Sequence, residues 1–203
     1  MKTFPKRYLW LVAAFGAAFM ALAFAWPRAD ATMPEFDSER SQAAKPLNIP
    51  AGAAVATFAG GCFWGIEDGL RKVPGVLDAR AGYSGGSTAN PTYYNKGDHK
   101  EAVQVVFDPQ QTSYESLLRT FFTIHDPTFG GGDRSYRSFL YTHSPEQAAQ
   151  AKRVIAELNR TGAYKSAPKP IQTQVQPAET FYPAEEYHQR YYEKRGGMGS
   201  CPI

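Results

Sequence analysis

The chain has 203 residues, 43% of them hydrophobic and 20% charged, with 22 lysines and arginines against 19 acidic residues and two cysteines. This length suits one domain with an appendage, and the composition excludes a chain that is disordered throughout. Two cysteines are too few for a disulfide-rich scaffold, and too few Cys and His lie close together in the sequence to predict a zinc site. A net charge of +3 is too small to indicate a nucleic-acid partner.

The first 31 residues have the pattern of an export signal. A basic head at residues 2–7 precedes 19 residues without charge, and Ala29-Asp30-Ala31 follows. This pattern predicts a signal peptide cleaved after about Ala31, with an uncleaved membrane anchor as the alternative. Both place the body outside the cytoplasm, in the periplasm or facing outward from the membrane, whereas a true start at Met33 would make the protein cytosolic. Residues 1–31 also carry the whole net charge of +3, since the remainder is formally neutral.

The rest of the chain divides into a polar segment at residues 32–53, which predicts a linker, and a body at residues 54–203. Strand and helix signals mix along the body without strict alternation, which predicts a two-layer α+β domain. In chain order the first expected elements are a strand at 55–59, a helix at 63–71, and strands at 76–83 and 102–107. Two helices follow, one opened by a capping box of Thr112 and Glu115 and one that runs from a Ser144 cap to about Arg160 with Gly162 as its stop. The last expected elements are a strand at 171–176, a helix at 183–192 and a Gly-rich tail that carries Cys201.

Cys62 stands where the first strand meets the first helix, directly after Gly60 and Gly61. Exposed backbone amides and the positive end of the helix favour a thiolate there. Because a helix end contributes only about 0.3–1 kcal/mol, it lowers a thiol pKa by less than about one unit, and another group or the substrate must help. A buried structural thiol is the alternative, although a core position rarely needs so many neighbouring glycines.

The segment Gly61-Cys62-Phe63-Trp64-Gly65 resembles the signature of the A-type peptide methionine sulfoxide reductases. Six further blocks are similar to that family's blocks and follow in the same order: Gly82-Tyr83-Ser84-Gly85-Gly86, Asn90-Pro91-Thr92-Tyr93, Glu101-Ala102-Val103, His125-Asp126-Pro127-Thr128, Tyr136-Arg137-Ser138 and Tyr187-His188-Gln189. The resemblance covers residues 54 to 203 approximately. It implies a two-layer α+β sandwich with a mixed β-sheet and flanking helices. The implied activity is the reduction of methionine S-sulfoxide, free or in proteins, to methionine in the repair of oxidative damage, without a bound metal or organic cofactor.

The resemblance also implies roles for single residues. Cys62 would be the nucleophile, Glu101 the proton donor, and Tyr93 and Tyr136 hydroxyl donors to the sulfoxide oxygen. Glu101 would then be protonated in the resting site, as burial arranges. An exposed charge at the start of a strand is the alternative for Glu101.

Attack on the sulfoxide would leave Cys62 as a sulfenic acid, which condenses readily with a second thiol. Cys201 is the only other cysteine, and its Gly-rich tail suits a group that must swing in. A permanent Cys62–Cys201 staple is the alternative, since closing so long a loop could stabilise the fold by about 5 kcal/mol. The resemblance implies thioredoxin, or an exported thioredoxin-like protein, as the reductant of a monomeric enzyme that contacts a membrane only if its first segment is uncleaved.

The substrate-binding residues implied by the resemblance are Phe63, Trp64 and Asp133. Phe63 and Trp64 would offer aromatic faces to the methyl group, with ordinary core packing as the alternative. Two connections are short against the family's pattern: seven residues separate Tyr93 from Glu101, and a compressed segment precedes Tyr136. Asp133 in that segment would stand in for a family aspartate at an altered spacing. We therefore expect a more open or altered substrate mouth.

Two other functions stay open on the residues alone. One is a Cys-His hydrolase or acyltransferase, although no spacing ties Cys62 to any of the four histidines, His99, His125, His143 and His188. His188 is expected to be a packing or hydrogen-bonding residue instead. The other is an exported binding domain with a structural Cys62–Cys201 disulfide, in which the 12 tyrosines form a contact surface.

Overall fold

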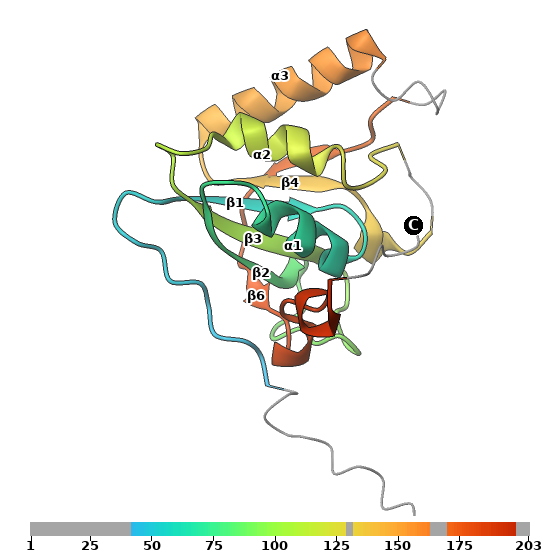
Figure 1. The fold of residues 1–203 in the computed structure, drawn as a ribbon. Helices are drawn as coiled ribbons and strands as arrows, with labels where there is room; N and C mark the ends of the chain where they lie inside the picture. Colours follow the sequence, from blue (N-terminus) through green and yellow to red (C-terminus); the bar gives the residue numbers. More distant parts are fainter. Residues whose placement is uncertain (1–41, 129–131, 163–169, 198–203) are drawn as a thin grey trace, which may run out of the picture. The chain divides into compact units, whose positions relative to one another are not determined.

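The computed structural model of the chain describes residues 42–128, 132–162 and 170–197 (Figure 1). Within these residues the elements follow the order strand β1 (Ala54–Ala59), helix α1 (Phe63–Arg71), strands β2 (Val76–Ser84) and β3 (Lys100–Phe107), helix α2 (Tyr114–Phe121), strand β4 (Phe139–Thr142), helix α3 (Pro145–Thr161), and strands β5 (Gln174–Pro177) and β6 (Tyr182–Pro183). Short 3-10 turns lie at Arg134–Tyr136, Glu186–His188 and Glu193–Arg195.

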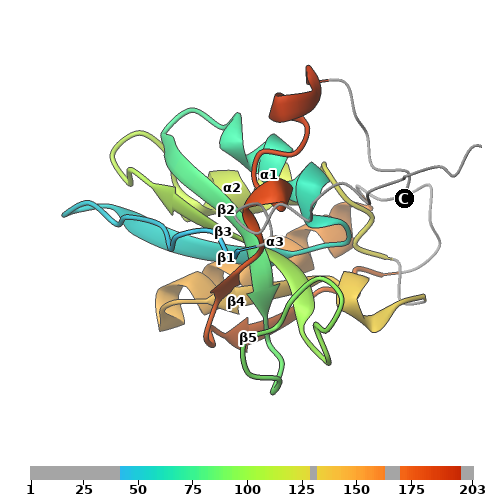
Figure 2. The same cartoon turned by 90° about the horizontal axis from the view of Figure 1, so that it is seen from below.

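The six described strands form one sheet in the order β5-β4-β1-β3-β2-β6. All neighbouring pairs are antiparallel except β4 and β5, which run parallel. Figure 2 looks at the sheet from below, with the strands from β2 through β3 and β1 to β4 and β5 side by side. The mixed sheet and its helices confirm the expected α+β fold.

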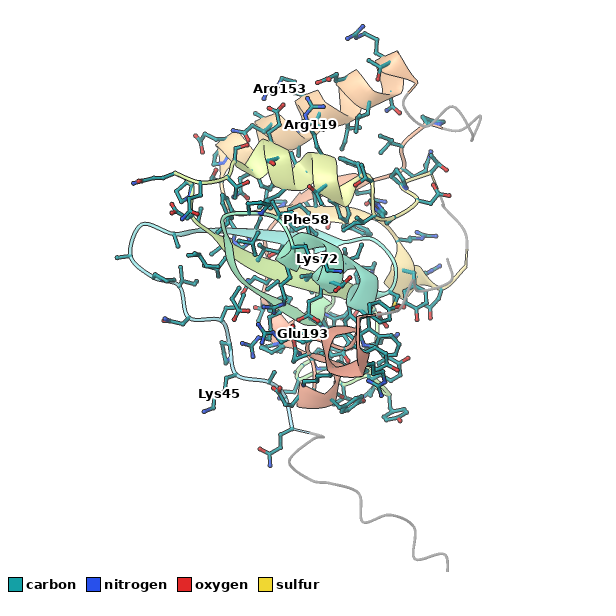
Figure 3. All side chains as sticks on the ribbon, viewed as in Figure 1. Lys45, Phe58, Lys72, Arg119, Arg153 and Glu193 are labelled. Atoms are coloured by element: carbon teal, nitrogen blue, oxygen red, sulfur yellow. The ribbon has the colours of Figure 1, made fainter. Side chains whose placement is uncertain are left out.

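The helices cover one face of this sheet. Side chains alternate between the two faces of a strand, and every second strand residue enters the same core as the helices. The core side chains include Ala56 and Phe58 of β1, Ala79, Ala81 and Tyr83 of β2, Val103 and Val105 of β3, Ile66 and Leu70 of α1, Leu117 and Phe121 of α2, and Val154 of α3. Phe58 lies beneath α2 in Figure 3. This core fixes β1 and α1 relative to each other, and with them the three residues between the two elements, Gly60, Gly61 and Cys62.

Most of the expected elements in the first part of the body are confirmed. The strands at 55–59, 76–83 and 102–107 and the helix at 63–71 all form. Ser144 caps α3 as expected, since its hydroxyl accepts a hydrogen bond from the amide of Gln147 over 3.3 Å, and Gly162 ends that helix in the left-handed conformation with a φ of 63°. The short strand β4 was not expected, because four residues are too few to show a clear pattern.

The expected capping box at the start of α2 is wrong by one residue. Ser113, not Thr112, is the cap, and its hydroxyl accepts from the amide of Ser116 over 3.1 Å. The carboxylate of Glu115 instead binds two arginines, Arg119 on its own helix and Arg153 on α3. Figure 3 labels both arginines, Arg119 on α2 and Arg153 on α3.

The expected helix at 183–192 is also wrong. Pro183 ends β6, and the chain then forms a 3-10 turn at Glu186–His188. Arg190 has a φ of 51°, which is outside the helical region, and Gln189 uses its side chain to bind the backbone of Ala81 and Ala184. These tertiary contacts replace the hydrogen bonds of a helix.

Two further expectations are corrected in their extent. The strand expected at 171–176 starts only at Gln174, because the amide of Ile171 donates to Asn159 and the amide of Gln172 donates to the carbonyl of Pro127. The described part of the expected linker, residues 42–53, has no regular element, but Ala44 and Leu47 are buried. The amide of Ala44 also donates to the carbonyl of Ala184, so this part packs on the body.

The expected signal segment lies outside the described residues, as does Cys201. Within the described residues, no helix combines the length and the apolar character that a membrane span requires.

Candidate active site

Cys62 lies at the junction of β1 and α1, as the sequence predicts. It is the N-cap residue of α1, with an extended backbone at φ −60° and ψ 120°, and it is half-buried. The first turn of this nine-residue helix carries no acidic side chain. The helix end therefore favours a negative charge on the cysteine sulfur.

The two glycines before Cys62 have different structural reasons. Gly61 has a φ of 96°, a conformation that side chains with a Cβ rarely adopt. Gly60 has no room for a side chain, since a Cβ there would come within 2.7 Å of the Phe121 ring and 2.8 Å of the His125 ring. The junction is thus held against α2 by close packing and turned by Gly61.

Glu101 on β3 is brought next to Cys62 by the fold. It is 1% exposed, and its Oε2 accepts a hydrogen bond of 3.2 Å from the backbone amide of Phe63, the residue after Cys62. Burial raises the pKa of Glu101 above its ordinary value, although Lys96 and the Phe63 amide oppose this effect. The alternative of an exposed charge is wrong, and the raised pKa favours the protonated carboxyl that an acid needs.

Tyr93 and Tyr136 come from two separate connections and meet at Glu101. Burial raises the pKa of both phenols, and the charges of Glu101 and Cys62 raise them further. Both hydroxyls therefore keep their protons at neutral pH and can donate hydrogen bonds. The structure brings together the four residues to which the resemblance assigns roles in the reaction: Cys62, Glu101, Tyr93 and Tyr136.

The rings of the two aromatic residues after Cys62 both lie against a further ring, that of His188. Phe63 is 1% exposed, and its ring lies 5.0 Å from the His188 ring. Trp64 is half-buried, donates from Nε1 to Nδ1 of His188 over 3.1 Å, and stacks on Tyr191 with 3.6 Å between the ring centroids. Phe63 thus belongs to the core, and the half-buried Trp64 packs against that core.

Asp133 is exposed and caps the turn that carries Tyr136. Its carboxylate accepts a hydrogen bond of 2.8 Å from the amide of Ser135, and this bond lowers the pKa of Asp133. Lys96 and Lys100 lower this pKa further. In this structure Asp133 therefore helps to orient Tyr136.

A model of the family described as peptide methionine sulfoxide reductase matches residues 54–203. The chain belongs to the peptide methionine sulfoxide reductase family. It is therefore an oxidoreductase that acts on methionine sulfoxide in protein repair.

Sequence relatives and solved structures agree with this assignment. The chain is 46% identical over 155 residues to a peptide methionine sulfoxide reductase MsrA of Methanoculleus marisnigri, covering 72% of this chain and 92% of the relative. It is 49% identical over 151 residues to one of Mycobacterium ulcerans, covering 72% and 86%. The crystal structure of reduced Mxr1 from Saccharomyces cerevisiae has a TM-score of 0.69 at 30% identity, covering 78% of this chain and 94% of Mxr1. Methionine sulfoxide reductase A of Corynebacterium diphtheriae has a TM-score of 0.67 at 30% identity, covering 81% and 92%.

The four histidines of this reductase give no support to the Cys-His pair that a hydrolase or acyltransferase would need. Their ring nitrogens bind other groups: His99 the carbonyl of Thr88, His125 the carbonyl of Phe121 and the Ser138 hydroxyl, His143 the Thr57 hydroxyl, and His188 the Trp64 indole. Burial lowers the pKa of His188 to about 4, so its ring is neutral. The expectation that His188 packs and hydrogen-bonds is confirmed, and nothing supports the hydrolase.

The structure adds two residues to the site of this reductase that the sequence analysis missed, Glu185 and Lys96. Glu185, which is 6% exposed, accepts 2.9 Å from the amide of Tyr93 and 3.0 Å from the hydroxyl of Tyr83. Lys96 places its ammonium 3.1 Å from Oε1 of Glu101. Lys96 could have been suspected from its place in the short Tyr93–Glu101 connection, whereas Glu185 comes from a distant part of the chain.

Proposed function

We propose that this reductase converts methionine S-sulfoxide to methionine through attack of Cys62 on the sulfoxide sulfur. The observation that carries the proposal is the buried carboxyl of Glu101, hydrogen-bonded to the amide that follows Cys62. A sulfoxide sulfur is attacked only when its oxygen is protonated or strongly hydrogen-bonded, because oxide is a poor leaving group. A protonated Glu101 beside a nucleophile at a helix N-terminus meets that need.

The thiolate of Cys62 attacks the sulfur while Glu101 gives its proton to the oxygen, and Tyr93 and Tyr136 donate hydrogen bonds to that oxygen. A sulfur–sulfur bond forms, the sulfur–oxygen bond of the substrate breaks, and the protonated oxygen leaves as hydroxide. Attack of hydroxide on the sulfur of Cys62 then breaks the sulfur–sulfur bond, methionine leaves as a thioether, and Cys62 becomes a sulfenic acid. Two electrons have then passed from the sulfur of Cys62 to the sulfur of the substrate.

We propose that Cys201 resolves the sulfenic acid. Its thiol condenses with Cys62, a disulfide forms and water leaves. A dithiol reductant then restores both thiols. The structure of Mxr1 in complex with Trx2, with a TM-score of 0.55 at 29% identity, supports a thioredoxin or an exported thioredoxin-like protein as this reductant. The chemistry is carried by side chains of this chain, and no metal or organic cofactor enters it.

The test of the catalytic proposal compares the two cysteines under two conditions. Cys62→Ser should form no methionine from methionine S-sulfoxide with any reductant. Cys201→Ser should form one methionine per enzyme molecule and then stop when thioredoxin is the reductant. Normal thioredoxin-driven turnover by Cys201→Ser would reject the resolving role, and equal rates on the R epimer would reject the stereochemical assignment.

We also propose that the enzyme works outside the cytoplasm. The basic head, uncharged run and Ala29-Asp30-Ala31 site at residues 1–31 support export. The test is to fractionate cells and to measure the mass of the protein in the fraction that contains it. A periplasmic protein that starts at Thr32 supports cleavage, an intact membrane-bound chain supports an anchor facing outward, and a cytosolic protein that starts at Met33 rejects export.

A further inference from the structure

We propose that Lys96 is a positioning residue for Glu101, which holds the carboxyl in the site and stabilises the carboxylate that forms when Glu101 gives up its proton. This inference rests on the proposed reaction and assigns a residue that the reaction as written above does not use.

The position of the Lys96 ammonium carries the inference. Its Nζ lies 3.1 Å from Oε1 of Glu101, and the two side chains are 19% and 1% exposed. The same ammonium lies 5.2 Å from the ring centroid of Tyr93 and 5.3 Å from that of Tyr136. Lys96 is thus in contact with the three groups proposed to hold the sulfoxide oxygen. A lysine taken out of water at such a point loses hydration, and the carboxyl oxygen of Glu101 and the two ring faces compensate for that loss.

The connection is built to turn Lys96 inward. Before it, Thr92 and Asn95 exchange two backbone hydrogen bonds of 3.3 and 3.0 Å. After it, Gly97 has a φ of 57°, and a Cβ at Gly97 would overlap the side chain of Thr88. The next carboxylate, on Asp98, accepts from the amide of Ser87 over 2.8 Å. The loop is therefore fixed on both sides of Lys96.

The charges around Glu101 make Lys96 the principal group that favours its ionised form. Burial raises the pKa of Glu101, Lys96 opposes this most strongly, the amide of Phe63 opposes it less, and Asp133 raises it further. Four more titratable groups surround this pair: the phenols of Tyr83, Tyr93 and Tyr136, which interact with Glu101, and the imidazole of His188, which interacts with Lys96. A buried carboxyl without Lys96 would hold its proton too tightly to act as an efficient acid.

In the reaction, Lys96 acts at one step only. The proton passes from the carboxyl of Glu101 to the sulfoxide oxygen as Cys62 attacks the sulfur, and the carboxylate left behind pairs with the Lys96 ammonium. Glu101 takes a proton back from water before the next turnover. Lys96 keeps its own protons throughout, so it touches the acid and not the reacting sulfur.

The first test is the pH profile of kcat/KM for methionine S-sulfoxide with dithiothreitol as reductant. Lys96→Met should lower the plateau by roughly tenfold, a part of the 10²- to 10⁴-fold typical of a general acid. It should also move the alkaline limb up by about 1–3 pH units, because an opposite charge within contact distance lowers a carboxyl pKa by that much. Lys96→Arg should keep the alkaline limb at its wild-type pH, because arginine retains the positive charge. Lys72→Met is the matched control, since Lys72 pairs with Asp68 on the surface of α1 (Figure 3) and should leave the profile unchanged.

The second test does not need activity. A protonated carboxyl has an infrared C=O band. The band that the wild type shows and Glu101→Gln lacks belongs to Glu101 and reports its protonation directly. In Lys96→Met this band should persist to a pH about 1–3 units higher than in the wild type. A band and an alkaline limb that both stay at their wild-type pH in Lys96→Met overturn the inference. A wild type that forms no methionine overturns the proposed function instead, and the infrared titration still decides whether Lys96 acts on Glu101.

Discussion

The backbone amide of Phe63 donates a hydrogen bond of 3.2 Å to Oε2 of Glu101, which fixes a buried carboxyl one residue away from Cys62. Because burial raises the pKa of Glu101, activity should fall as the pH rises through that pKa and the carboxyl loses its proton. Glu101→Gln should lower kcat/KM by about 10²- to 10⁴-fold and remove this alkaline limb. Glu157→Gln, a surface change on α3, is the control for a carboxyl-to-amide change and should behave as the wild type. A Glu101→Gln enzyme with wild-type kcat would exclude Glu101 as the acid.

The phenols of Tyr93 and Tyr136 are predicted to act mainly in the transition state. A hydrogen bond to a charged group contributes about 1.5–3 kcal/mol, so Tyr93→Phe and Tyr136→Phe should each lower kcat by roughly ten- to a hundredfold with little change in KM. Tyr94→Phe is the matched control, because Tyr94 is 86% exposed beside Tyr93. Steady-state kinetics at one pH decide the prediction, and a change confined to KM would contradict it.

Glu185 is predicted to support both stability and catalysis through Tyr93. Glu185→Ala leaves the buried Tyr83 hydroxyl and the Tyr93 amide without their acceptor, at a cost of about 1–3 kcal/mol for each unpaired group. Urea denaturation should show a loss of at least about 2 kcal/mol, and kcat should fall because Tyr93 is no longer held. Glu186→Ala changes the adjacent, exposed glutamate and should leave both values near the wild type. Equal stabilities of the two variants would disprove the prediction.

His125 is predicted to make the fold less stable in acid. Burial lowers its pKa to about 4, so the native ring stays neutral between pH about 6.5 and about 4 while the unfolded chain binds a proton. The unfolded state then binds more protons, and the free energy of unfolding should fall by about 1.4 kcal/mol per pH unit as the pH decreases through this window. In His125→Gln the free energy of unfolding should depend less steeply on pH than in the wild type, and the difference should equal that slope. Parallel curves of wild type and variant in urea titrations at several pH values would contradict this account.

Two glycines near Cys62 are predicted to respond in opposite directions to alanine. Gly60→Ala forces a methyl group into the rings of Phe121 and His125 and should destabilise the fold by about 1–3 kcal/mol. Gly65→Ala meets nothing within 4 Å and lies inside α1, so it should stabilise the fold by about 0.5–1 kcal/mol. Thermal unfolding of the pair gives the answer, and a Gly60→Ala protein as stable as Gly65→Ala would refute the packing at the junction.

Local chemistry in the sequence determined the elements that lie next to the site. The bounds of α1 follow from Gly60 and Gly61 before it and from the Pro74-Gly75 break after it, because backbone conformations are restricted at those residue types whatever surrounds them. The Ser144 cap and the Gly162 stop of α3 could be predicted for the same reason. The ordered family blocks also indicated which residues meet at Cys62, and the fold brings Cys62, Glu101, Tyr93 and Tyr136 together.

The tertiary structure decided what depends on groups far apart in the chain. The helix expected at 183–192 is replaced by turns, because Gln189 binds Ala81 on β2. The charge environment of Glu101 also depends on the third dimension: its burial in the sheet raises its pKa, and only the fixed turn at Gly97 brings the Lys96 ammonium onto it. A sequence shows which residues can be acids or cations, whereas a pKa depends on burial and on the distances between charges, and these exist only in the folded chain.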